Sequence, residues 1–258
     1  MKVRLSYGPP PKPSTRRRED TLHVEISRNA HDAVGHAARL LAEWIQDPAV
    51  RHLMVAGGNT PLPLDEAVAQ RGLPVPELRG HVLDEYVGVP STDPRTCTSL
   101  LRRTVAEAWG VKPVNFFGLK SEEEGALSAV LGHERRIDEA GGLDAIVLGL
   151  GRNGHLGFNE PGSLETSGAR VLDLEATSIE ANRDWFGGDY APNKGATVGL
   201  RTILGARRVL LLAFGPAKAD AVRAMLRGPR AASCPASFLQ SHPGAHVFLD
   251  ERAAAGLA

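Results

Sequence analysis

The stretch Asp144–Leu150 (DAIVLGL), which closes on Gly151, decides the fold class of this chain. A short continuous apolar run that ends in glycine is typical of a strand buried on both faces of a sheet. A second such run, Arg208–Phe214 (RVLLLAF), is followed by Gly215 and a segment with helical spacing. Buried strands that alternate with helices predict a parallel sheet covered on both faces.

The remaining chain beyond residue 20 follows the same alternation. Further strands are expected at Thr21–Ile26, Leu53–Ala56, His81–Leu83 and Ala245–Leu249, and helices at Ala30–Ile45, Leu62–Gln70, Ser99–Trp109, Glu122–Glu139 and Ala217–Leu226. Four strands end in glycine or acidic residues, and open parallel sheets bind ligands beyond the carboxyl ends of their strands. We therefore expect one α/β domain over residues 21–258, Rossmann-like and doubly wound, with a site at that edge.

The composition excludes several classes of protein. The 30 Lys and Arg residues balance 30 Asp and Glu residues, so no overall basic field favours nucleic acid. No run of 18 apolar residues predicts a membrane span, and the N-terminus lacks the apolar core of a signal peptide. Two cysteines fit a reducing compartment better than a disulfide scaffold. We expect a cytoplasmic protein, monomeric or homo-oligomeric, with a small-molecule ligand.

Residues 1–20 differ from the rest. They contain Pro9–Pro11, Pro13 and the basic run Arg16–Arg18. Proline and charge disfavour a packed element, so we expect a flexible N-terminal arm.

Glycine and polar residues follow the strand at Leu53–Ala56. The run is Gly57-Gly58-Asn59-Thr60-Pro61, in which Asn and Thr are expected to cap a helix that starts at proline. Such a helix start offers free N–H groups to a phosphate, although a well-capped tight turn is equally compatible. Lys218, beyond the strand at Arg208–Phe214, can reach an anion at the same edge or be solvated.

Asp84 and Glu85 end the strand at His81–Leu83. Successive side chains alternate in direction, so one carboxylate can face a cleft as a general base while the other makes a structural contact. Burial would raise such a carboxylate's pKa towards neutrality. A pair that caps a helix or braces a loop is the alternative.

The most informative stretch is Leu148–Gly162 (LGLGRNGHLGFNEPG). Its glycines crowd the exit of a buried strand, and among them lie an amide, an imidazole and a carboxylate: Asn153, His155 and Glu160. A histidine with a carboxylate partner is a tunable proton shuttle. The pattern is not a dinucleotide fingerprint, and no second His or Cys lies at metal-ligand spacing.

Together these stretches resemble the glucosamine-6-phosphate deaminase family, which is related to the 6-phosphogluconolactonases. The resemblance rests on Gly57–Pro61, Leu83–Gly88 (LDEYVG), Gly151–Gly162 and Ser233–Gln240 (SCPASFLQ), in the same order along the chain. The Phe-Asn-Glu-Pro ending of the third motif is similar to the deaminases rather than the lactonases.

The resemblance implies conversion of an amino-sugar 6-phosphate and water into a ketose 6-phosphate and ammonia, without cofactor or metal. Asp84 would move a proton between C1 and C2, and His155 would assist ring opening. Glu160 would orient His155, and Asn153 would join them. The phosphate would be held by Gly57, Gly58, Asn59, Thr60 and Lys218.

Three departures from the family pattern stand out. Asn153 replaces an acid found in some members. Arg95–Thr98 (RTCT) lacks an expected aromatic residue. Arg183 is displaced by one residue from the family's arginine and precedes an unexpected Trp185. Arg183 and Glu85 are therefore secondary site candidates, and Gly187-Gly188 suggests a lid segment here.

Three other functions are compatible with these residues. The change at Arg95–Thr98 allows another substrate such as galactosamine 6-phosphate. A 6-phosphogluconolactonase-like hydrolase would give Glu160 no clear role. A non-catalytic sugar-phosphate sensor is the third, although residues 1–20 are too short for a helix-turn-helix.

Overall fold

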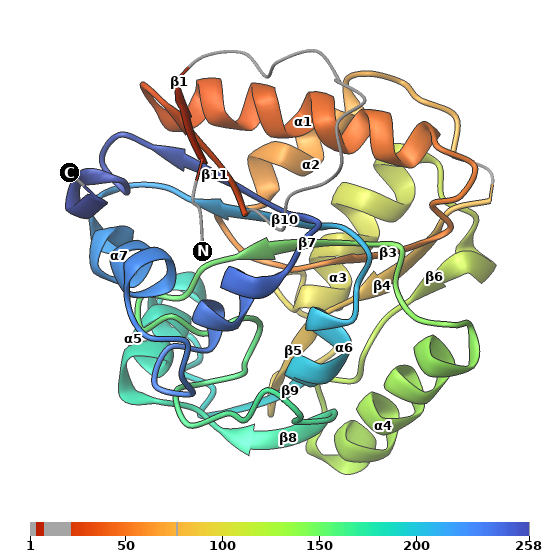
Figure 1. Cartoon of the computed structure of the whole chain (residues 1–258). Coiled ribbons are helices and arrows are strands. Elements are labelled where there is room, and N and C mark those ends of the chain that lie inside the picture. Colours follow the sequence, from red (N-terminus) through yellow and green to blue (C-terminus); the bar gives the residue numbers. More distant parts are fainter. Residues whose placement is uncertain (1–3, 8–21, 76, 258) are drawn as a thin grey trace.

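A computed structural model describes residues 4–7, 22–75 and 77–257, and its core is an eight-stranded sheet (Figure 1). The strand order is β1 (Arg4–Tyr7), β2 (His23–Ser27), β11 (Ala245–Asp250), β10 (Val209–Ala213), β7 (Ala145–Gly149), β3 (His52–Val55), β4 (Arg79–Val82) and β6 (Phe116–Phe117). Every neighbouring pair is parallel. The predicted fold class is thus confirmed, and the run that suggested it forms β7 at the centre.

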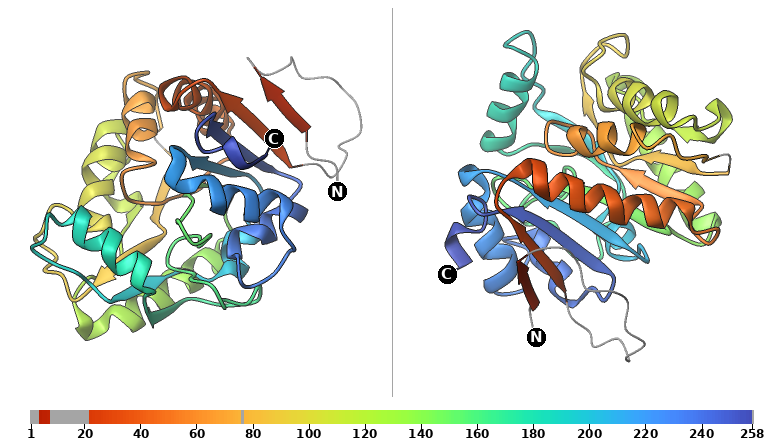
Figure 2. Two further views of the ribbon diagram at one scale, coloured as in Figure 1. Left: turned by 90° about the vertical axis from the view of Figure 1, so that its left-hand side faces the viewer. Right: turned by 90° about the horizontal axis from the view of Figure 1, so that it is seen from above.

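Helices cover both faces of this sheet (Figures 1 and 2). They are α1 (Ala30–Gln46), α2 (Leu62–Ala69), α3 (Cys97–Leu101), α4 (Glu123–Glu139), α5 (Ala176–Trp185), α6 (Leu200–Leu204) and α7 (Ala219–Arg227). A π-helical turn, η1 (Arg102–Glu107), continues α3, and 3-10 turns are η2 (Pro113–Asn115), η3 (Pro216–Lys218), η4 (Pro235–Ser241) and η5 (Ala255–Leu257).

The alternation of side chains along each strand divides the core in two. Leu53 and Val55 of β3 pack with α1, α2 and α3 on one face, whereas Met54 packs with α6 and α7 on the other. All three side chains are at most 2 % exposed. Successive residues of a strand point to opposite faces, so a strand between two helical layers must be apolar throughout. This explains why the central strands are continuous apolar runs.

Local chemistry explains where the longest helix on the first face begins. The Asn29 side chain accepts a hydrogen bond from Asp32 N–H, which caps α1. Residues at helical spacing, among them Ala37 and Leu41, are then fully buried against the sheet.

A second, smaller sheet was not predicted. It is antiparallel, in the order β5 (Asp84–Val87), β9 (Lys194–Thr197) and β8 (Arg170–Asp173). Its strand β5 begins two residues after β4 ends, so Asp84 and Glu85 open a strand of this sheet rather than end one.

The expected N-terminal arm falls mainly outside the described residues. Within it, Arg4–Tyr7 forms β1, which pairs with β2 at the edge of the large sheet. That the remaining residues form an arm stays a prediction.

Candidate active site

The glycine-rich turn after β7 is held in place by the buried side-chain amide of Asn159. Asn159 is fully buried, and its Nδ2 donates to the carbonyls of Leu156 and Val198 at 2.9 Å each. Arg170 of β8 donates to its Oδ1 at 2.9 Å. The His155 ring lies against Gly151, where any side chain would come within 2.4 Å of it. This close approach is a physical reason for glycine at the strand exit.

This turn joins three of the predicted site residues directly. His155 Nδ1 lies 3.2 Å from Glu160 Oε2, and Asn153 Nδ2 donates to the same oxygen at 2.7 Å. The Asn153 Oδ1 accepts the backbone N–H of His155 at 3.2 Å. A fourth residue, Ser178 of α5, places its Oγ 3.3 Å from His155 Nδ1. We call Asn153, His155, Glu160 and Ser178 the His155 network.

The charges of the His155 network follow from these contacts. Burial alone would raise the pKa of Glu160, but hydrogen bonds and the attraction of His155 outweigh it and lower this pKa to about 2. Glu160 is therefore an anion at neutral pH and only accepts hydrogen bonds. The neutral His155 ring then carries its proton on Nδ1, which leaves Nε2 as the nitrogen that can take up a proton. The His155 side chain is 21 % exposed, so solvent or a ligand can reach it.

Asp84 and Glu85 are both buried, and their surroundings differ. Glu85 accepts the N–H groups of Cys97 at 2.9 Å and Thr98 at 2.7 Å, so it caps the start of α3. The Asp84 side chain forms no hydrogen bond or ion pair with another described residue. Burial, and next the charge of Glu85, raise the pKa of Asp84 to about 7, while burial raises the pKa of Glu85 to about 7 against its N–H donors. Of the two, Asp84 is the carboxylate free to act as a base.

Asp84 and the glycine-rich turn are tied together through β9. Asp84 pairs with Thr197, whose Oγ1 accepts the backbone N–H of Phe158 at 3.3 Å. Gly157 lies against Leu83, where an added side chain would come within 3.2 Å. Leu83 and Gly157, 74 positions apart in sequence, thereby meet at one edge of the large sheet.

Residues Gly57–Thr60 form the predicted loop between β3 and α2. Gly58 has φ +107°, a conformation that only glycine adopts easily. The expected caps were wrong: α2 begins at Leu62 with no side-chain cap, and neither Asn59 nor Thr60 bonds its first turn. Among the described residues, the backbone N–H groups of Gly58, Asn59 and Thr60 have no acceptor. Free N–H groups before a helix start suit an anion.

Lys218 lies beside this loop, at the end of η3. Its Nζ donates to the Leu150 carbonyl at 2.6 Å. Thr60 of the loop lies against Gly149, the residue that precedes Leu150. Burial, and next the nearby charge of Arg152, lower the pKa of Lys218 to about 8. A buried ammonium beside a second cation is stabilised when an anion binds. We call Gly57–Thr60 with Lys218 the anion loop.

Helix α5 supplies residues that the sequence analysis missed. Besides Ser178, Thr177 Oγ1 accepts a hydrogen bond from Asn153 Nδ2 at 3.4 Å. Neither side chain lies in a conspicuous motif, so only their spacing near Arg183 could have pointed to them. Arg183 itself is exposed on the last turn of α5, and its side chain bonds none of the other candidates. The structure does not join Arg183 to the anion loop.

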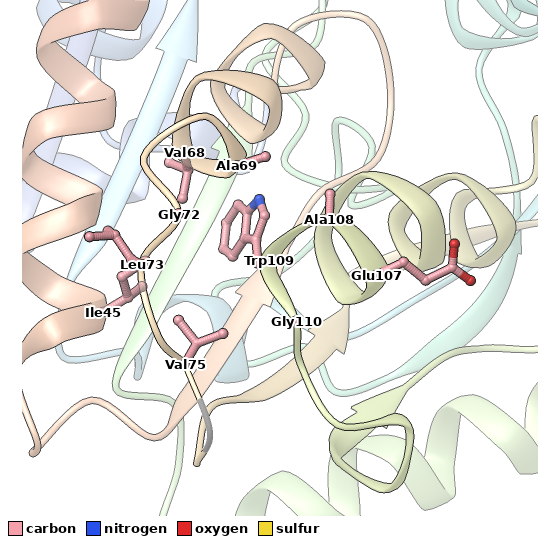
Figure 3. A pocket seen from close by; sticks show the side chains of 10 residues that line it. All are labelled: Ile45, Val68, Ala69, Gly72, Leu73, Val75, Glu107, Ala108, Trp109 and Gly110. Carbon is pink, nitrogen blue, oxygen red and sulfur yellow. The ribbon is translucent and has the colours of Figure 1, made fainter.

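A cavity of about 280 Å3 lies elsewhere, between α1, α2 and Trp109. Figure 3 shows the Trp109 ring facing Val68, Leu73 and Val75, and none of the candidate site residues lines this cavity. In the described part of the chain, no group of three or more His, Cys, Asp or Glu side chains is arranged to hold a metal ion. None of its helices is long and apolar enough to cross a membrane.

Comparison with known proteins places these features in context. The family of glucosamine-6-phosphate isomerases and 6-phosphogluconolactonases matches residues 26–248. A glucosamine-6-phosphate deaminase of Streptomyces avermitilis is 42% identical over 242 residues, which cover 92% of this chain and 93% of the relative. One of Bifidobacterium longum subsp. infantis is 37% identical over 249 residues, with 91% and 92% covered.

Solved structures of the same two kinds of enzyme resemble the fold of this chain. A monomeric glucosamine-6-phosphate deaminase, described as a missing link of the NagB superfamily, has a TM-score of 0.85 and 31% identity, and 90% of this chain and 99% of that one are covered. A 6-phosphogluconolactonase from Trypanosoma cruzi has a TM-score of 0.74 at 20% identity, with 92% and 97% covered, and shares the fold.

Proposed function

Because this chain belongs to the family of glucosamine-6-phosphate isomerases and 6-phosphogluconolactonases, we propose that it converts glucosamine 6-phosphate and water into fructose 6-phosphate and ammonia. The observation that carries the proposal is the hydrogen-bonded pair of His155 and Glu160 in the glycine-rich turn, to which strand β9 ties the strand of the buried Asp84. Named deaminases at 37–42% identity over nine tenths of the chain support the choice of substrate.

Substrate binding begins at the anion loop. The N–H groups of Gly58, Asn59 and Thr60 and the Lys218 ammonium provide the donors and positive charge that a phosphate requires. A phosphate anchored here restricts where the sugar carbons lie, and this restriction lowers the entropic part of the barrier.

Ring opening is the role we assign to His155. Its Nε2 accepts the proton of the C1 hydroxyl and returns a proton to the ring oxygen, which breaks the C1–O bond and yields the open-chain aldehyde. Glu160 stabilises the imidazolium formed in between, as a carboxylate that stays ionised at neutral pH can do. Asn153 and Ser178 hold Glu160 and His155 in place.

Asp84 then moves a proton from C2 to C1. Removal of the C2 proton gives an enolate that carries the amine. Return of this proton at C1, with a proton passing from the amine to O1, gives a C1 hydroxyl and an imine at C2. Water adds to C2 and the amine leaves as ammonia, so the atoms balance as one water consumed for each ammonia formed. A carboxylate whose pKa is raised to about 7 is a stronger base than an exposed one.

The direct test compares three substrates side by side. Ammonia and fructose 6-phosphate are measured for glucosamine 6-phosphate, ammonia and the corresponding ketose 6-phosphate for galactosamine 6-phosphate, and the free acid for 6-phosphogluconolactone. Glucosamine 6-phosphate is expected to react, and galactosamine 6-phosphate and 6-phosphogluconolactone are expected to react at least tenfold more slowly. A faster reaction of the galactosamine epimer or of the lactone would replace the proposal with that activity. Binding of glucosamine 6-phosphate without any product would support a sensor instead.

Asp84→Asn tests the assigned base. General-base catalysis contributes about 10²–10⁴-fold, so kcat is expected to fall by that factor while the substrate still binds. In the wild type, kcat/KM is expected to rise with pH through about 7, because Asp84 acts only when ionised. An unchanged kcat in Asp84→Asn would remove Asp84 from the mechanism.

A further inference from the structure

The segment in which this chain departs from the family pattern contacts the end of α5 and the residues that follow it. Trp185 Nε1, at the end of α5, donates to the Arg95 carbonyl at 2.9 Å. Arg95 Nη1 donates to the Phe186 carbonyl at 2.7 Å and to Asp189 Oδ2 at 2.8 Å. Two departures noted in the sequence, at residue 95 and at residue 185, are therefore partners in space.

The Arg95 side chain is itself held in one orientation. Its Nε and Nη2 donate to the two carboxylate oxygens of Asp93 at 2.9 and 2.7 Å. The guanidinium carbon lies 5.1 Å from the centre of the Phe186 ring and 5.9 Å from that of Tyr190. A planar group with five donors can make all these contacts together, whereas an ammonium cannot.

From Phe186 the contacts continue to the site. The Phe186 ring is fully buried and packs edge-on against Tyr86 with centres 5.0 Å apart, and Tyr86 lies two residues after Asp84. Tyr86 also packs against Phe158 of the glycine-rich turn at 5.5 Å. At its other end, α5 carries Ser178, which contacts His155.

We infer that Arg95 is a positioning residue, which fixes the end of α5 and thereby holds Ser178 and the aromatic contact Tyr86–Phe158 against the reacting groups. Arg95 touches none of the assigned catalytic side chains, so it acts through Phe186 and α5. This inference rests on the proposed function for its effect on turnover, while its effect on α5 is independent of substrate. In the right-hand view of Figure 2, α5 and the loop before α3 project from the same end of the molecule.

The test compares Arg95→Ala and Arg95→Lys with Arg103→Ala. Arg103 of η1 is a matched control because it is a nearby arginine that donates to the Ser99 and Pro94 carbonyls, without a hydrogen bond to α5 among the described residues. Displacement of a site by about 1 Å can reduce turnover up to a hundredfold. We expect Arg95→Ala to lower kcat by about tenfold to a hundredfold with KM changed less than about threefold, since the anion loop is left intact.

Tryptophan emission gives a second readout that needs no substrate. Trp44 and Trp109 are buried, whereas Trp185 is half-buried at the end of α5. Release of α5 in Arg95→Ala should expose Trp185 and shift its emission to longer wavelength, as a difference spectrum against Trp185→Phe would show. Arg95→Lys should be intermediate in both readouts, and Arg103→Ala should match the wild type.

The outcomes separate this inference from the proposed function. A kcat and emission for Arg95→Ala equal to those of Arg103→Ala would overturn the role of Arg95. An emission shift in a protein that lacks deaminase activity would support the contact but reject the function. If Arg95→Ala fails to fold, Arg95→Lys and Asp189→Asn are measured instead, and wild-type values in both would overturn the inference.

Discussion

Two regions of this chain place the histidine side chain in opposite surroundings. In the His155 network, an imidazole that is partly exposed is bonded to a buried, ionised Glu160. Between β3, β4 and α4, the side chains of His52, His81 and His133 lie together in the interior. We call these three residues the histidine stack.

The histidine stack is held in its neutral form. Arg79 Nη1 lies 3.2 Å from His52 Nε2, and arginine only donates, so His52 carries its proton on Nδ1. That proton points at His81 Nε2, 3.1 Å away. Burial, and next the neighbouring positive charges, lower the pKa of His81 to about 2, and burial lowers that of His133 to about 4.

The difference shows that a nearby carboxylate and access to solvent decide what an imidazole does. His155 is partly exposed and has the anionic Glu160 as a hydrogen-bond partner. Within the described ranges, no carboxylate lies in hydrogen-bond contact with the histidine stack, and burial keeps His81 and His133 neutral near pH 7, so the stack packs as aromatic surface. His81 accordingly lies 4.9 Å from the Phe117 ring in a stacked arrangement.

The largest expected effect is on turnover in His155→Asn. Loss of the proton shuttle should lower kcat about 10²–10⁴-fold, measured as ammonia released from glucosamine 6-phosphate. The thermal midpoint should change little, because the side chain is partly exposed. A kcat within tenfold of the wild type would show that His155, like the histidine stack, is not needed for turnover.

Glu160→Gln is expected to have the next largest effect. The amide keeps the size of the side chain but removes the charge that stabilises an imidazolium, so kcat should fall about a hundredfold. Its NH2 group can also donate to His155 Nδ1 and favour the wrong tautomer. Wild-type turnover in this variant would show that the charge of Glu160 is not needed.

Ser178→Ala should reduce kcat by several-fold only. A neutral hydrogen bond contributes about 0.5–1.5 kcal/mol, which corresponds to a factor of about two to ten. Thr177→Ala is a suitable companion, because it removes the longer contact to Asn153 and should have a smaller effect. A larger loss in Thr177→Ala than in Ser178→Ala would reverse this order.

The smallest effect on turnover is expected in His81→Phe, within about twofold of the wild type. This variant keeps a ring in the histidine stack but leaves the His52 Nδ1–H unpaired, so the free energy of unfolding at pH 7 should fall by about 1 kcal/mol. A tenfold loss of kcat would show that the histidine stack serves the site.

The pH dependence of stability sharpens the same comparison. Because the pKa of His81 and His133 is lowered on folding, the unfolded chain binds more protons below about 6.5, and stability falls as pH drops towards 4. In His81→Phe this decline should be smaller, as chemical denaturation at pH 7, 5.5 and 4.5 would measure. Asp84 and Glu85, with raised pKa values, contribute stability that is lost as pH rises through about 7. The wild type and His81→Phe share this contribution of Asp84 and Glu85, so it cancels in their comparison.

Much of the fold could be predicted because strands and helices leave local patterns. The strands at Leu53–Ala56, Asp144–Leu150 and Arg208–Phe214 match β3, β7 and β10 within one residue at each end. The small antiparallel sheet could not be predicted, since β8 and β9 are short and their pairing depends on residues far along the chain. The helix expected at Ser99–Trp109 begins instead at Cys97, where the Thr96 side chain caps it and Glu85 from a distant strand accepts two further N–H groups.

By itself, the sequence predicted a parallel α/β sheet and the pairing of His155 with Glu160, because continuous apolar runs mark buried strands and the two side chains lie in one glycine-rich turn. Tertiary structure alone decided that Ser178 completes that pair, that Glu85 caps a helix while Asp84 stays free, and that Arg95 meets Trp185. These contacts join residues 12 to 90 positions apart. Such contacts depend on how whole elements pack, and hydrophobic packing leaves no signal at the polar residues that it brings together.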